Sequence, residues 1–197
     1  MKKFGDEGFI EILREGQQDA RNTHIQKGSV WAGDTQLQFQ EREIIKDLLW
    51  IWMPKEFAPL GKELIKIKYP NENRPDIIYS NQETTVNVSF SHKQEKLEAG
   101  QEEELRDYMA VVIQNLYPTC SILHKESVTL GENLVAWMDF VTPAIDMQIY
   151  NVMFFTPLKG RLLMGSCNCL AQDKEDWQDL FVQMLASIRT ERKSLSD

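Results

Sequence analysis

Two cysteines near the C-terminal end of the chain have the spacing of a paired thiol site. Cys167 and Cys169 are separated by one residue in an apolar run, so in a β-strand both thiols point to the same face. Paired thiolates can bind a soft metal ion such as Zn²⁺, but a structural zinc site normally has four ligands. Cys120 is the only other cysteine, and no Cys-x-x-Cys or His-x-His pair completes a set. We interpret Cys167 and Cys169 as small core residues, and predict neither a metal site nor a cofactor.

The three histidines, His24, His92 and His124, are candidates for acid–base or nucleophilic chemistry. Ser89 or Ser91 could form a Ser/His/Asp relay with one of them, because the members of a triad need not be neighbours in sequence. However, the chain has no Gly-x-Ser-x-Gly elbow that would expose a serine nucleophile. We interpret the histidines as surface residues and predict no catalytic residue.

Asp139 is the acid with the most unusual setting, because its neighbours Trp137, Met138 and Phe140 are all apolar. In a central strand such a carboxylate is either paired inside the protein or placed on the outer face, and we expect the outer face. Phosphate-binding loops are missing as well, since the sequence contains neither Gly-x-x-x-x-Gly-Lys nor Gly-x-Gly-x-x-Gly.

Two tryptophans are the candidate partner-binding residues. Trp50 and Trp52 share one face of an extended segment, where they could line a hydrophobic groove or anchor an interface, since tryptophan is enriched at such positions. The more common role of such residues is to pack beneath a helix, or here beneath the N-terminal extension. Both interpretations remain open at this point.

Composition and charge restrict the class of protein. The 197 residues carry a formal net charge of −8, the opposite sign to that of most nucleic-acid-binding proteins. Asp6 and Glu7 interrupt the segment where a signal peptide would be apolar, and no apolar run approaches the length needed to cross a bilayer. An odd number of cysteines argues against a disulfide framework. We therefore predict a cytoplasmic protein with no nucleic-acid partner and no membrane insertion.

The second half of the chain has the clearest secondary structure. A helix is predicted over residues 101–117, with an apolar stripe at spacings of three and four, and a second helix follows an N-cap at Asp173. Between them lie four strand-like runs, at 121–130, 134–141, 147–156 and 161–170. Because the connections are short, these strands must be antiparallel. The stripe of the first helix comprises Leu105, Tyr108, Met109, Val112 and Leu116. The stripe of the second helix comprises Trp177, Leu180, Phe181, Met184, Leu185 and Ile188.

The first half is less regular but contains further strands. Period-two alternation predicts a strand from Thr35 and a clear strand over 84–90. A second apolar stretch spans 44–53, and further strands are predicted over 64–69 and 77–80. The order of elements predicts an α+β fold, an antiparallel sheet covered by helices. We predict a loop-rich N-terminal extension over residues 1–35, a single domain over 36–190 and a polar tail over 191–197.

This order resembles the superfamily that includes the eukaryotic Ran-binding Mog protein and the photosystem II PsbP subunit, and it looks closest to uncharacterised bacterial members. The resemblance covers about three quarters of the chain and implies an α-β-α sandwich without enzymatic machinery. Known relatives bind other proteins: a small GTPase, the photosystem core or the transmembrane segments of secreted effectors. The residues that carry the resemblance are Trp52 to Phe57, Lys68-Tyr69-Pro70, Arg74 to Ile78 and Val86 to Phe90.

The resemblance and the missing catalytic motifs together favour a non-catalytic protein-binding module of the adaptor or chaperone-like type, with a protein as its partner. The alternative is a small-molecule-binding protein or hydrolase with a pocket between the sheet and the helices. That alternative requires His124, His92 or Asp139 to meet other polar groups in a concave site. A homodimer is a further possibility, because the strand order leaves at least one sheet edge that a second copy could cover.

Overall fold

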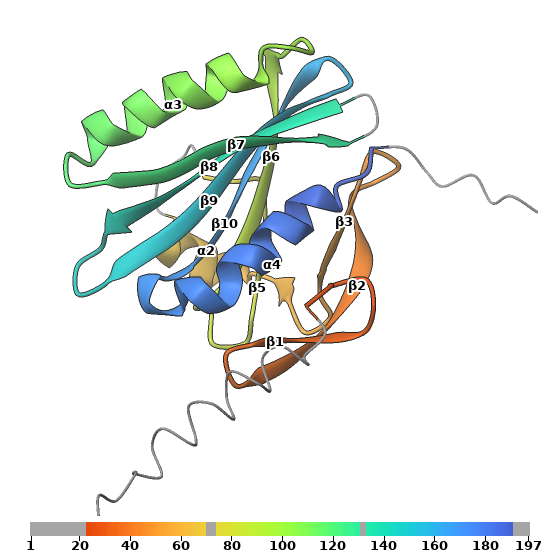
Figure 1. The fold of residues 1–197 in the computed structure, drawn as a ribbon, viewed down its shortest axis with the longest axis vertical. Coiled ribbons are helices and arrows are strands. Elements are labelled where there is room, and N and C mark those ends of the chain that lie inside the picture. The colour runs from red at the N-terminus through yellow and green to blue at the C-terminus, as the bar shows by residue number, and fades with distance from the viewer. Residues whose placement is uncertain (1–22, 70–73, 131–132, 191–197) are drawn as a thin grey trace, which may run out of the picture.

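The computed structural model describes residues 23–69, 74–130 and 133–190, which form two antiparallel sheets and three α-helices (Figure 1). The larger sheet has seven strands in the order β4-β5-β6-β10-β9-β8-β7, and the smaller has the order β1-β2-β3. The four-strand meander predicted from the sequence is confirmed. The strands of the large sheet are β4 (Ala58–Pro59), β5 (Ile77–Ser80), β6 (Asn87–Lys96), β7 (Ser121–Leu130), β8 (Asn133–Pro143), β9 (Gln148–Leu158) and β10 (Arg161–Leu170).

Two long helices cover opposite faces of the large sheet (Figure 1). Helix α3 (Glu102–Leu116) packs against β7, β8 and β9, whereas α4 (Lys174–Ala186) packs on the other face, after the short 3-10 turn η1 (Ala171–Asp173). The predicted α+β class and both predicted helices are therefore confirmed. No helix among the described residues is long and apolar enough to span a bilayer.

The face under α4 holds the larger core. Phe181 and Trp177 of α4 have ring centroids 5.4 Å apart, and Phe181 stacks on Tyr150 of β9 at 6.5 Å. Trp177 also contacts Phe57, at 5.9 Å, which connects the helix to the chain that follows the small sheet. The apolar stripe predicted for α4 is therefore the face that the helix buries, because apolar side chains that recur at helical spacing share one face.

Helix α3 buries a face that matches its predicted stripe only in part. Its buried residues are Glu102, Arg106, Ala110 and Ile113. Of the predicted stripe, Leu105 and Met109 are partly buried against the same cluster, whereas Tyr108 is 64% exposed. Arg106 faces the sheet, where its Nη1 donates to Glu126 O of β7 at 3.0 Å and its Nε donates to the Asp107 carboxylate at 3.0 Å.

One prediction in the first half of the chain is wrong, and one boundary differs. The predicted strand over 64–69 is instead helix α2 (Lys62–Lys68), because a short apolar run cannot by itself distinguish a strand from a helix. The second apolar stretch, predicted over 44–53, corresponds to β3 (Leu49–Pro54), while its first two residues end β2 (Thr35–Ile45). A turn separates them: Asp47 has a φ of 58° and its N–H donates to Glu43 Oε1 at 2.8 Å.

The described part of the predicted N-terminal extension contains a strand. β1 (Ser29–Ala32) pairs with β2, with Val30 opposite Leu37, because Val30 and Ala32 alternate toward the core. Ile25 is also buried, and its N–H donates to Gln183 Oε1 of α4 at 3.1 Å. Residues 1–22 and the predicted tail 191–197 lie outside the described residues, so the predicted domain limits stay predictions.

Gly165 in β10 lies where there is no room for a side chain. A Cβ at this position would lie 2.2 Å from Ser89 O and 2.6 Å from a ring carbon of Phe154. We expect Gly165→Ala to lower the free energy of unfolding by about 3 kcal/mol, because the ladder between β10 and β6 must open to admit the methyl group. Urea denaturation measures this change. Gly61→Ala is the control, since its Cβ meets nothing within 4 Å, and equal stability losses in the two variants would contradict the prediction.

Candidate functional site

The cysteine pair lies in the core under α4. Cys167 and Cys169 are both fully buried on the face that carries Tyr150, which confirms their interpretation as core residues. Burial raises the pKa of the Cys167 thiol, and burial together with the negative charges of Asp173 and Asp176 raises the pKa of Cys169 to about 12. The described residues contain no group of three His, Cys, Asp or Glu side chains that could hold a metal ion.

Asp139 is buried and paired, so the expected outer-face position is wrong. Its carboxylate is 0% exposed and accepts three hydrogen bonds that hold it inside the protein. His124 Nδ1 lies 2.9 Å from Oδ1, the His124 backbone N–H donates to the same oxygen at 2.7 Å, and the Tyr150 hydroxyl donates to Oδ2 at 2.8 Å. Burial, followed by the hydrogen bond and charge of Asp139, raises the pKa of Tyr150.

A β-bulge makes this pairing possible. The register between β7 and β8 shifts between Ile122 and His124, although residues two apart in a regular strand would share a face. Ile122 packs into the cluster under α3, while His124 reaches Asp139 on the opposite face. The sequence could not reveal this pair, because the bulge breaks the alternation that assigns side chains to faces.

The arrangement resembles the carboxylate–imidazole half of a catalytic relay. Because a carboxylate only accepts hydrogen bonds, His124 carries a proton on Nδ1. The other ring nitrogen, Nε2, belongs to a side chain that is 47% exposed. Ser89, which we weighed as a nucleophile, lies on the other face of the sheet, where its hydroxyl pairs with Ser166 at 3.0 Å. His92 Nε2 contacts Leu158 O at 3.0 Å. The fold therefore brings His124 and Asp139 together but keeps Ser89 and His92 apart from them.

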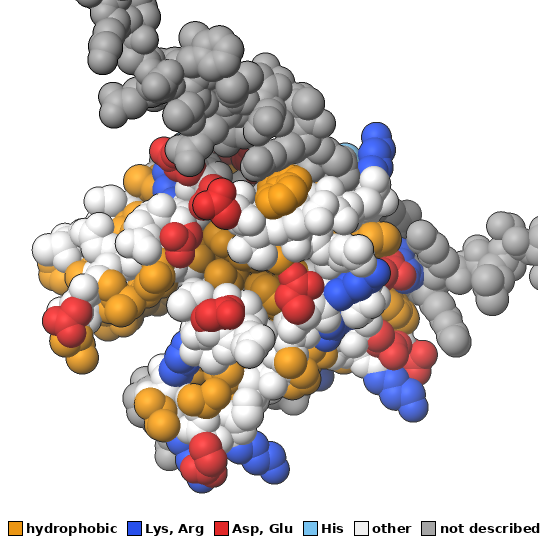
Figure 2. All heavy atoms as spheres, turned by 90° about the horizontal axis from the view of Figure 1, so that it is seen from below, with side chains coloured by type: hydrophobic (Ala, Val, Ile, Leu, Met, Phe, Trp, Pro, Cys, Tyr) orange, Lys and Arg blue, Asp and Glu red, His pale blue; other side chains and the backbone are white. Residues whose placement is uncertain are grey.

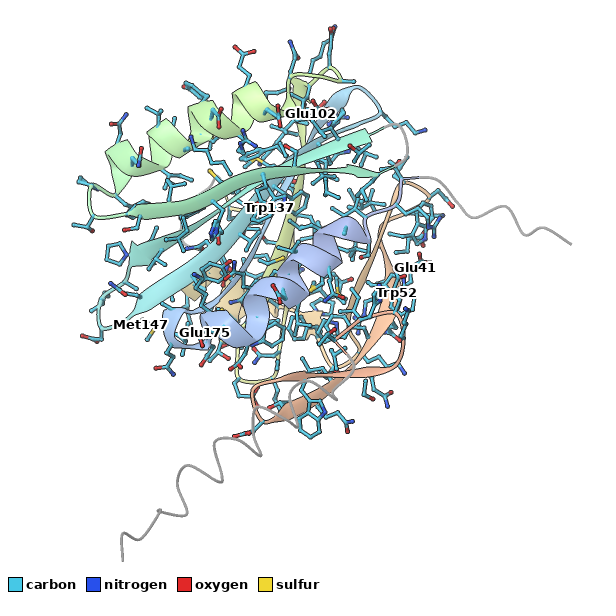
Figure 3. The ribbon with its side chains drawn as sticks, viewed as in Figure 1. Glu41, Trp52, Glu102, Trp137, Met147 and Glu175 are labelled. Carbon is cyan, nitrogen blue, oxygen red and sulfur yellow. The ribbon has the colours of Figure 1, made fainter. Side chains whose placement is uncertain are left out.

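The tryptophan pair lies on the small sheet. Trp50 is 8% exposed and lies beneath Arg189, whose guanidinium carbon is 4.6 Å from the centre of the indole ring. Backbone hydrogen bonds of 2.9 Å join Trp50 and Arg189 in both directions, and Arg189 also pairs with Glu41 at 3.0 Å. Trp52 is partly buried, and Figure 3 shows it beside Glu41, on the opposite side of the molecule from Met147. A partner-binding role for Trp50 and Trp52 stays a prediction.

A cleft of about 520 Å³ opens where α2 faces the connection between β8 and β9. Its lining comes from the end of α2, from the connection and from the sheet face opposite α4. Figure 2 shows this end of the molecule hollowed between two projections that carry hydrophobic side chains. The lining residues are Lys68, Tyr69, Asn87, Ala144, Ile145, Asp146, Met147, Ile149 and Asn168.

Exposed apolar side chains occur on both segments that flank this cleft and form its two banks, the β8–β9 connection and α2, although only those of the connection line the cleft itself. Ile145 is 100% exposed and Met147 51% on the β8–β9 connection, while Ile67 is 75% and Leu64 42% exposed on α2. The connection is fixed by a turn hydrogen bond of 2.8 Å from Ala144 N–H to Met147 O. Sequence reasoning missed these residues because Leu64 and Ile67 were assigned to a strand, and because the connection was interpreted only as a turn.

The floor of the cleft is part of a polar row that crosses the sheet. The Ser80 hydroxyl donates to Asn87 Oδ1 at 2.9 Å, and Asn87 Nδ2 donates to Asn168 Oδ1 at 2.9 Å. Farther along, Asn151 Nδ2 donates to Thr142 Oγ1 at 3.2 Å. Burial raises the pKa of Tyr69, and a hydrogen bond from the Asn168 side chain acts in the opposite direction. Neither His124, His92 nor Asp139 lines the cleft.

Comparison with known proteins identifies the fold. No family model matches the chain, and no curated protein matches it either. The structure is similar to that of the PsbP protein CyanoP from the cyanobacterium Synechocystis, with a TM-score of 0.58 and 10% sequence identity over 81% of this chain and 96% of that one. The fold is therefore PsbP-like, as predicted; a specific relation to Mog and membership in a bacterial group stay predictions.

Two other solved structures are more distant. LpqN of Mycobacterium tuberculosis, which is involved in cell envelope biogenesis, has a TM-score of 0.45 and 11% identity over 81% of this chain and 94% of that one. The type VI secretion immunity protein TplEi of Pseudomonas aeruginosa, in complex with a peptide, has a TM-score of 0.44 and 12% identity over 94% and 84% of the two chains. At these scores neither likeness carries an argument about this chain.

The Asp139 cluster predicts a large effect of a nearly isosteric substitution. Asp139→Asn places an amide N–H₂ among three donors, so at least one buried donor loses its acceptor. We expect the free energy of unfolding to fall by about 2–4 kcal/mol, as measured by urea denaturation. Asp179→Asn, at an exposed position on α4, serves as the control and should cost less than about 0.5 kcal/mol. Equal effects of the two substitutions would contradict the buried pairing.

The buried thiols and Tyr150 predict a loss of stability in base. Their pKa values are raised in the folded protein, whereas the unfolded chain loses these protons near the usual values of 9.0 and 10.0. The associated stability is complete below about pH 9 and is lost as the pH rises toward the folded pKa values. Cys169→Ala should therefore flatten the decline of unfolding free energy between about pH 9 and about pH 11. Parallel curves for the two proteins would refute this assignment.

Proposed function

We propose that the protein is a protein-binding module and that its docking site is the cleft between α2 and the β8–β9 connection. The observation that carries this proposal is the exposure of Ile145 and Met147, both of which line one hollow, opposite a helix whose Leu64 and Ile67 are also exposed. Contiguous apolar side chains left in water at the rim of a hollow are typical of interaction sites.

Folding alone does not account for these side chains. Helix α2 buries none of its residues, and Ile145 makes no contribution to either hydrophobic cluster. A turn that needed only to close the β8–β9 hairpin would be served by small or polar residues. A partner that covers the cleft would remove this apolar surface from water.

A segment of another protein suits the cleft better than a rigid small molecule. The banks lie on a hairpin tip and on a seven-residue helix, and Met147 can adapt its unbranched side chain to different partners. The volume of about 520 Å³ also lies within the range of small-molecule pockets, so a small-molecule-binding protein is the second candidate. Free thiols at Cys120, Cys167 and Cys169 support the proposal of a cytoplasmic protein.

Selection from a phage-displayed library of short random peptides tests the docking site. We expect the wild-type protein to enrich peptides that contain apolar residues, and Ile145→Glu combined with Met147→Glu to weaken their binding about tenfold or more. Fluorescence anisotropy with the enriched peptides measures the change. Val111→Glu is the matched control, because Val111 is 54% exposed on α3, away from the cleft.

The outcomes separate the proposed surfaces. Enriched peptides that bind the double variant as tightly as the wild type would overturn the cleft, and a loss confined to Trp52→Ala would move the docking site to the small sheet. Failure to enrich any peptide, together with a small molecule that raises the melting temperature in a stability screen, would favour the second candidate.

A further inference from the structure

We infer that the cleft recognises an acidic segment of its partner, with a carboxylate against Lys68 and Tyr69 and a neighbouring apolar side chain against Ile145 and Met147. This inference rests on the proposed function and names the chemistry of the partner. The observations that carry it are the hydrogen-bond donor on the cleft floor and the placement of the charges on its banks.

The floor of the cleft offers a hydrogen-bond donor. Asn87 Oδ1 accepts from the Ser80 hydroxyl and Asn168 Oδ1 accepts from Asn87 Nδ2, so each amide oxygen already has one partner. The Asn168 side chain also bonds the Tyr69 hydroxyl oxygen, which leaves the Tyr69 O–H proton to point elsewhere. A ligand that brings an oxygen acceptor to this floor can therefore bond Tyr69.

The charge on the α2 bank has the sign that an acidic ligand requires. Helix α2 carries Lys62, Lys66 and Lys68 against a single acid, Glu63, in a chain whose formal net charge is −8. Lys68 lines the cleft and is held there by a hydrogen bond from its Nζ to Thr84 O. Partial burial lowers the pKa of Lys68, and a carboxylate beside the ammonium group would favour its charged form.

The opposite bank sets the orientation of the segment. Asp146 lies on the β8–β9 connection among Ile145 and Met147, so a carboxylate is repelled from that bank and attracted to α2. The apolar side chain of the partner then faces the connection while its acidic side chain faces Lys68. Such a charge arrangement affects partner choice and association rate more than total affinity.

Three pools of fluorescein-labelled short peptides test this inference by anisotropy titration. The acidic pool contains Asp and Glu with Leu, Ile and Phe, the amide pool replaces the acids with Asn and Gln, and the basic pool replaces them with Lys and Arg. We expect the acidic pool to bind the wild type about tenfold more tightly than the amide pool. We expect the basic pool to bind most weakly.

Variants assign the preference to the cleft. Lys68→Gln should reduce the binding of the acidic pool and leave that of the amide pool unchanged. Tyr69→Phe should reduce the binding of both pools, because amide oxygens also accept hydrogen bonds. Lys159→Gln and Tyr108→Phe are the matched controls, since Lys159 lies in the turn between β9 and β10 and Tyr108 lies on α3. Both controls should keep the full preference for the acidic pool.

Failure of this inference differs from failure of the proposed function. Equal binding of the acidic and amide pools, abolished in both cases by the Ile145→Glu, Met147→Glu double variant, would overturn the acidic preference and keep the docking site. Tightest binding by the basic pool would also overturn it. Binding of no pool at all would overturn both proposals.

Discussion

A seven-stranded antiparallel sheet has two wide faces to protect from water, and the described part of this chain supplies one long helix for each face. On one face, α4 and the small sheet cover an aromatic core. On the other, α3 packs mainly against β7, β8 and β9, and Leu162 and Met164 of β10 join its apolar cluster, so the rest of β10 and the neighbouring β6 need a different solution. That solution is polar: Ser89 pairs with Ser166, and Asn87 pairs with Asn168. Paired side chains can lie near water or beneath a loop without leaving a buried donor or acceptor unsatisfied.

The same constraint explains where the cleft lies. Because α3 does not extend over the end of β10 and β6, the polar row there is reached from outside between α2 and the β8–β9 connection. On the α4 face, by contrast, the carboxylate of Asp139 is fully buried among its hydrogen-bond partners. Asp139 accepts from His124 of the edge strand and from Tyr150 of the core, so it joins β7 to β8 and β9 through side chains as well as through the ladder.

The sequence was most informative where residues close together in the chain determine the structure. Short turns between alternating runs predicted the meander strand by strand, and the spacing from Trp177 to Leu185 predicted the buried stripe of α4. It was least informative where distant residues decide the outcome. Arg106 takes a buried position on α3 by pairing with β7, and the bulge beside His124 brings its imidazole to the Asp139 carboxylate. Neither contact leaves a periodic pattern, so the stripe of α3 was predicted only in part, the position of Asp139 was predicted incorrectly, and the cleft was not predicted at all.

The two banks of the cleft are nearly independent of the core, and this separates binding from folding. Helix α2 buries no residue, and the β8–β9 turn is closed by a backbone hydrogen bond that does not involve the side chains of Ile145 or Met147. Substituting these exposed side chains removes little buried apolar area, so the free energy of unfolding changes little. Substitutions at Asp139 or Gly165 act in the opposite way, on residues that the fold requires. A loss of binding at the banks in a protein of unchanged stability therefore reports on recognition itself.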